Sequence, residues 1–157
     1  MSTTSSGSQA LAERMLTDAY EFVLSGWCQG AAALDECSRP IEPASAFARK
    51  WSALGALERA RRRSPEPPGL ALEAFQRGKL ALTAAMNDVP QAWNDRPDRH
   101  QSEVLTALAE AVRLVDLPQA VPASAVEDVE DLDDVAPRWS LDREPFPARA
   151  AETPVEP

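Results

Sequence analysis

Four stretches of the chain carry apolar side chains at helical spacing. In the first stretch they are separated by four, four, three and one positions, which places them on one helix face. Gly26 follows directly, and glycine is favoured just past a helix C-terminus. We predict a first helix from about Ser8 to Ser25, with the apolar face Leu11, Met15, Ala19, Phe22 and Val23. Residues 1–7 are small and polar, and we expect them to be disordered.

Two further helices are predicted on either side of a proline-rich break. Ser45 can cap a second helix that runs to about Arg63, and Gly55 within it would let another helix approach. The apolar face of this helix comprises Phe47, Trp51, Leu54 and Leu57. After the prolines, which interrupt a helix because they lack an N–H donor, a third helix is predicted from about Gly69 to Met86.

A fourth helix is predicted to begin at Asp98 or His100 and to end at Pro118. The residues before it, 87–99, are typical of turns, with Val89, Pro90 and Trp93 as apolar anchors. Residues 27–43 have no helical period, and we prefer an ordered loop for them. The alternative is a short β-hairpin that pairs the segment 31–34 with Ile41.

These elements predict an all-α domain over residues 8–117, a compact bundle of about four helices with an ordered loop or minimal β-hairpin after the first. An irregular orthogonal packing is the alternative to a regular bundle. Residues 118–157 are predicted to be a disordered, acidic, proline-rich tail. Packing of its apolar residues back onto the helices is the competing interpretation; they are Trp139, Leu141 and Phe146.

The formal net charge of -9 is unevenly distributed. Residues 118–157 hold 10 acidic and 3 basic side chains, a net charge of -7, whereas the first 117 residues hold 15 acidic and 13 basic, a net charge of -2. Overall acidity disfavours binding to nucleic acid, since phosphate contacts need clustered Lys and Arg. Acidity is therefore mainly a property of the tail, and we expect any partner of the tail to be basic.

Cysteine content and hydropathy indicate a cytoplasmic protein without a membrane partner. Cys28 and Cys37 are too few for a disulfide scaffold, and the N-terminus lacks a signal-peptide pattern. No stretch approaches the roughly 20 apolar residues of a membrane span. Cys28 follows a helix C-terminus, the negative end of the helix dipole, which raises a thiol pKa. We interpret it as a buried apolar residue rather than a nucleophile.

Three strings occur in a fixed order along the chain. Residues 26–31 read GWCQGA, residues 50–57 read KWSALGAL, and residues 92–95 read AWND, with EVL at 103–105. Together they resemble a family of small, uncharacterised actinobacterial proteins, a domain of unknown function with ordered WCxGA, RWCALGAL and WND...EVL strings. The resemblance covers roughly residues 10–115. It implies a compact helical domain and no particular activity.

The chain departs from that pattern near two predicted helix starts. Ser52 stands where the family string reads cysteine, so the resemblance implies no site that needs two thiols here. His100 stands where a threonine would head the last helix, and we expect Asp98, at a position where the family has glycine, to cap that helix instead.

The same strings supply the candidate site residues. Asn94 and Asp95 can hydrogen-bond the backbone of a tight turn that leads into the last helix, and we prefer this structural role. The alternative is a ligand pocket with aromatic walls and a few polar groups. Its candidate residues are Trp27, Gln29, Trp51, Trp93, Asn94 and Asp95.

No catalytic group, cofactor or metal site is assigned from the sequence. His100 is the single histidine, which excludes a site built on several imidazoles, and no phosphate-binding glycine loop occurs. The basic cluster at the end of the second helix complements the helix dipole and could pair with the acidic tail; its members are Arg59, Arg61, Arg62 and Arg63.

We therefore favour a small helical binding or interaction module without catalytic activity. The rival hypothesis is a small enzyme or accessory factor of specialised metabolism that holds an apolar small molecule between its helices. A closed aromatic core would favour the module, and an open aromatic pocket would favour the rival.

Overall fold

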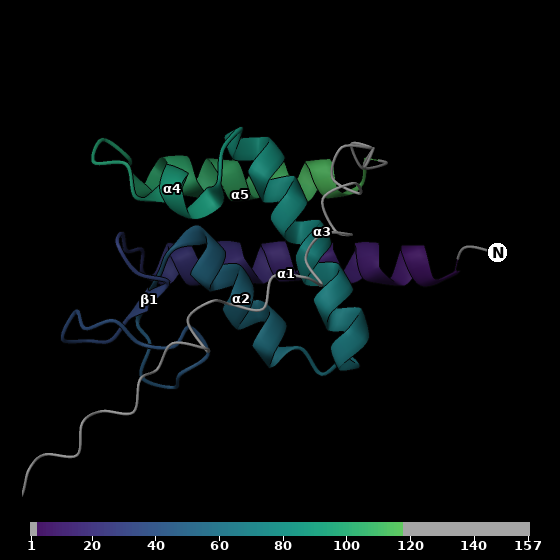
Figure 1. The fold of residues 1–157 in the computed structure, drawn as a ribbon, viewed down its shortest axis with the longest axis horizontal. Coiled ribbons are helices and arrows are strands. Elements are labelled where there is room, and N and C mark those ends of the chain that lie inside the picture. The colour runs from purple at the N-terminus through teal and green to yellow at the C-terminus, as the bar shows by residue number, and fades with distance from the viewer. Residues whose placement is uncertain (1–2, 118–157) are drawn as a thin grey trace, which may run out of the picture. The chain divides into compact units, whose positions relative to one another are not determined.

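The computed structural model describes residues 3–117, which fold into five helices and one two-stranded sheet (Figure 1). The helices are α1 (Thr3–Ser25), α2 (Ala53–Arg63), α3 (Pro68–Met86), α4 (Pro90–Asn94) and α5 (Gln101–Val115), and the strands are β1 (Ala33–Leu34) and β2 (Lys50–Trp51). The all-α class is confirmed, with one short helix more than the four predicted. The predicted tail, residues 118–157, and its apolar island lie outside the described residues.

Helix α1 is the element on which the domain is assembled, because it contacts α2, α3 and α5. In Figure 1, α5 lies beside α1 and α3 crosses both helices. The predicted apolar stripe of α1 faces inward, and its members Met15, Ala19 and Val23 are at most 1% exposed. Leu57, Leu82 and Leu108 complete the core from α2, α3 and α5.

The first helix begins at Thr3 rather than Ser8, so residues 3–7, predicted to be disordered, are helical. Ser8 is fully buried, and its hydroxyl donates to the Glu73 carboxylate of α3 over 2.7 Å. The buried Ser8 therefore attaches the start of α1 to α3. The small polar residues 3–7 do not reveal this contact in the sequence.

The second helix begins at Ala53, and the predicted start at Ser45 is wrong. Ser52 is the N-cap, with its hydroxyl accepting the Gly55 N–H over 3.1 Å. Trp51 lies in β2, opposite Ala33 of β1 in an antiparallel pair. The helical spacing of Phe47 and Trp51 was misleading, since Phe47 is 72% exposed and Trp51 is buried from a strand, with its ring against Phe22.

The segment after α1 combines the two predicted alternatives. Most of it is an ordered loop, and β1 pairs with the more distant β2 rather than with Ile41 in a regular hairpin. Ile41 still donates its N–H to the Ala33 carbonyl over 3.1 Å, and Leu34 forms an isolated bridge with Pro40. The predicted pairing thus survives only as these two contacts.

Two glycines have a different role from the one predicted. Gly26 does not adopt a left-handed conformation at the end of α1; a Cβ there would overlap the Arg49 carbonyl oxygen. In α2, a Cβ at Gly55 would overlap the Ala32 carbonyl oxygen, so a loop and not another helix approaches it. Both glycines allow the chain around the small sheet to lie directly against the helices.

The last part of the described chain contains a helix that we did not predict. Residues 87–99 include α4, with Pro90 at its first position, where the missing N–H costs nothing. The N-cap of α5 is His100 rather than Asp98, and the Glu103 carboxylate accepts the His100 N–H over 2.8 Å. Asn87, with a φ of 51°, ends α3 in the left-handed conformation.

We expect Gly55→Ala to destabilise the domain by about 3 kcal/mol or more, because the added methyl collides with backbone that cannot retreat. The control is Gly69→Ala, at an exposed helical position where a Cβ meets nothing within 4 Å. That change should stabilise by about 0.5 kcal/mol. Urea unfolding followed by circular dichroism compares the two, and equal midpoints would show that the close approach at Gly55 is not required.

Candidate functional site

The buried amide of Asn94 connects three segments that are distant in sequence. Its Oδ1 accepts the Trp27 indole N–H over 2.9 Å and the Ala53 N–H over 3.2 Å. Its Nδ2 donates to the Cys28 carbonyl over 3.0 Å and to Asp95 Oδ1 over 2.9 Å. Asn94 is fully buried, so these bonds replace those that the amide would make to water.

Asp95 and Gln29 extend this network. Asp95 Oδ1 accepts the Gly30 N–H over 2.9 Å, and both of its oxygens accept from the Gln91 amide. Gln29 Nε2 donates to the carbonyls of Asn94 and Arg96, over 2.9 and 2.7 Å. Burial alone would raise the pKa of Asp95, but the hydrogen bonds from Gln91, Gly30 and Asn94 hold it below its ordinary value.

The rings of Trp51 and Trp93 have other neighbours. The Trp51 ring packs against Phe22 with 5.4 Å between ring centroids, and its indole donates to the Pro43 carbonyl. The Trp93 ring lies under the Arg99 guanidinium, whose carbon is 3.6 Å from the ring centroid. The structure thus gathers Trp27, Gln29, Asn94 and Asp95 into one network, which holds loops together. A ligand pocket at the six residues stays a prediction.

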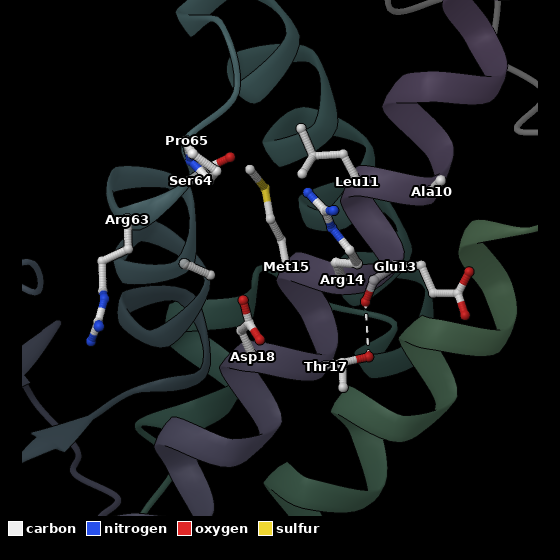
Figure 2. Close-up of a pocket in the computed structure, with 11 residues that line it drawn as sticks. Ala10, Leu11, Glu13, Arg14, Met15, Thr17, Asp18, Arg63, Ser64 and Pro65 are labelled. Carbon is white, nitrogen blue, oxygen red and sulfur yellow. Dashed lines mark hydrogen bonds between the residues drawn. The ribbon is translucent and has the colours of Figure 1, made fainter.

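A groove that sequence reasoning missed lies between α1 and the C-terminal end of α2 (Figure 2). Its volume is about 560 Å³, and its floor is formed by Leu11, Met15 and Ala60, each at most 5% exposed. Figure 2 shows the Met15 side chain pointing between the two helices toward Ser64. The remaining lining residues are Ala10, Glu13, Arg14, Thr17, Asp18, Arg63, Ser64 and Pro65.

A smaller hollow of about 220 Å³ lies next to the groove and shares Ala10, Leu11 and Arg14 with it. Arg14 forms an ion pair with Glu66 over 3.2 Å at this shared edge. The sequence does contain one signal for the groove. The prolines after Arg63 end α2 after 11 residues, so α2 is too short to cover the 23 residues of α1.

The arginine-rich end of α2 is not a uniform basic surface. Arg61 and Arg62 both donate to the Glu58 carboxylate, each through Nε over 2.9 Å. The bond from Arg61 is the main reason that the pKa of Glu58 lies below its ordinary value. Two of the four cationic side chains therefore share one carboxylate within their own helix.

Cys28 is buried, as predicted, and its thiol lies 3.6 Å from the Ala31 carbonyl oxygen. Burial, and then the charge of Asp95, raises the pKa of Cys28 to about 11, so it is protonated at neutral pH. Within the described residues both cysteines are unbridged, and no group of three His, Cys, Asp or Glu side chains could hold a metal ion. No helix in that range is long and apolar enough to cross a membrane.

Comparison with known families agrees with the resemblance drawn from the three strings. The sequence model of DUF6197, a family of unknown function, matches residues 8–114. The chain belongs to this family. The matched range of DUF6197 begins within α1 and ends within α5, so it includes the network around Asn94 and the groove. No curated protein and no solved structure matches the chain.

We expect Asn94→Ala to destabilise this DUF6197 domain by about 3 kcal/mol, because it leaves buried groups of Trp27, Cys28 and Ala53 without partners. Gln76→Ala is the control, since Gln76 is an exposed amide on α3 and its loss should change stability by less than about 0.5 kcal/mol. Urea unfolding measures both, and a shift of the Trp27 indole proton in NMR spectra reports the lost bond. Equal stability of the two variants would contradict the role of Asn94.

Asp95 should contribute to stability above the ordinary Asp pKa of about 3.9 and lose that contribution as pH falls through its lowered folded value. We therefore expect Asp95→Asn to lose less stability than the unmodified protein between pH 7 and pH 3. Exposed Asp98, which makes no hydrogen bond to the described residues, provides the control Asp98→Asn. Urea unfolding at both pH values tests this. If Asp95→Asn and Asp98→Asn lost equal stability between pH 7 and pH 3, this role of Asp95 would be excluded.

Proposed function

We propose that this DUF6197 protein is a small helical binding module and that its ligand, an apolar small molecule, occupies the groove between α1 and α2. The single observation that supports this is the composition of the groove. Its floor is apolar, and its volume of about 560 Å³ lies in the range of pockets that hold small ligands.

Charged and polar side chains on the rim of the groove would orient the bound ligand. Arg14, Asp18 and Arg63 carry charges of both signs around the apolar floor, and Thr17 offers a hydroxyl whose own proton is donated to the Glu13 carbonyl. An apolar ligand with one polar end fits this arrangement, because burial of its body gains free energy while its polar end stays at the charged edge.

The residues of the Asn94 network support a non-catalytic function. The polar atoms through which Asn94 and Asp95 would contact a substrate already hydrogen-bond the chain itself. Binding without catalysis is therefore our preferred function, and catalysis in a small enzyme or accessory factor is the rival. We also propose a cytoplasmic location, supported by unbridged Cys28 and Cys37.

A protein partner is the second candidate, and one side chain favours it. Phe47 is 72% exposed beside a hollow of about 360 Å³ that it lines together with Ile41 and Arg49. Exposed aromatic residues next to arginine are typical of interaction surfaces.

Filling the groove should abolish binding. We expect the indole of Ala10→Trp, at an exposed position on the rim, to occupy the groove without disturbing the core. The matched control is Ala109→Trp, at an exposed position of α5. Thermal-shift screening against apolar small molecules should identify compounds that raise the melting temperature of the unmodified protein and of Ala109→Trp but not of Ala10→Trp. Equal shifts in all three proteins would exclude the groove.

A further inference from the structure

The arginines of the described chain fall into two groups. Within residues 3–117, eight arginines form an ion pair with an Asp or Glu, and three do not. The three without an ion pair are Arg49, Arg59 and Arg63. Ion pairing is thus the rule in this domain, and the exceptions are not scattered over its surface.

Two of the three exceptions, Arg59 and Arg63, lie over aromatic rings, and the third, Arg49, bonds to the same 43–48 loop as Arg59. The guanidinium carbon of Arg59 is 4.8 Å from the Trp51 ring centroid and 5.1 Å from that of Phe22. The guanidinium carbon of Arg63, one turn later in α2, is 5.9 Å from the Phe22 centroid. Burial, followed by the positive charges of Arg63 and Arg49, lowers the pKa of Arg59. Arg59 is therefore close enough to Arg63 and to Arg49 to be repelled by both.

Structural roles explain only part of this cluster. Arg59 Nη1 donates to the carbonyls of Pro43 and Ser45, both over 2.9 Å, and Arg49 Nη1 donates to those of Ala46 and Ala48. Carbonyl oxygens accept hydrogen bonds but carry no net charge, so no ion pair within residues 3–117 compensates these cations. The buried Nε of Arg59 has no partner among the described residues.

Arg63 has no structural role of this kind. It is exposed and makes no hydrogen bond or ion pair within residues 3–117. Asp18 and Arg63 both line the groove, yet the two side chains form no ion pair. Clustered cations that the domain leaves without a counter-charge, although carboxylates pair with its other arginines, indicate a site that an external anion completes.

We propose that Arg49, Arg59 and Arg63 form a binding site for a phosphate monoester group. Such a group carries a charge close to -2 at neutral pH and presents three acceptor oxygens, which suits several guanidinium groups better than a single carboxylate does. Arginine is the side chain that binds phosphate through paired N–H donors. This site goes beyond the proposed function, because Arg49 and Arg59 do not line the groove.

The test uses inorganic phosphate, which has no apolar part that could occupy the groove. Titration at pH 7.5, followed by proton–nitrogen NMR, should shift the Trp51 indole and the amides of residues 59–63 in a saturable manner. Potassium chloride at the same ionic strength should not do so, because screening alone does not saturate at one site.

Arg63→Gln is the decisive variant, and Arg62→Gln is its matched control. Both remove one exposed positive charge from the last turn of α2, but Arg62 is paired with Glu58. We expect phosphate binding to weaken about tenfold in Arg63→Gln and less than about twofold in Arg62→Gln. Equal weakening in both variants, equal shifts with potassium chloride, or no shift with phosphate would overturn the proposal. Ala10→Trp should still bind phosphate, which separates this result from that of the groove.

Discussion

A buried amide must have its hydrogen bonds satisfied within the protein, and at Asn94 this requirement determines where three segments lie. The loop after α1 must present the Trp27 indole and the Cys28 carbonyl, and the start of α2 must present the Ala53 N–H. Because each bond has a defined direction, α4 can occupy only one position relative to these segments. The small sheet, which places Trp51 beside the end of α1, depends on the same arrangement.

Helical periodicity predicted the long helices because each has one continuous buried stripe. Leu11, Met15 and Val23 on α1 lie where their spacing placed them. The same reasoning failed at Ser45, since the backbone around Trp51 bonds to Gly26 and Cys28, and pairing between distant segments leaves no periodic signal. Helix α4, with five residues, is shorter than two turns and therefore too short for a period to be read.

The candidate sites were harder to predict than the fold. The strings around Trp27, Trp51 and Trp93 did identify residues that matter, and their polar side chains hold loops together through hydrogen bonds. The groove arises from the difference in length between α1 and α2. The arginines without an ion pair within residues 3–117 are recognised only when the partners of the other arginines are known. The prolines after Arg63 are a local signal for the length of α2, but the partners of the arginines depend on the arrangement of the helices and loops.

The contacts of α1 also determine when the domain can fold during synthesis. Ser8 bonds to Glu73, Gln9 bonds to Asp116, and Gln101 donates to the Val23 carbonyl, so both ends of α1 find partners that are made much later. Helix α1, which is made before its partners, therefore keeps part of its apolar stripe uncovered until translation has passed α5. Exposed stripes of this kind are where nascent chains associate with one another or with chaperones.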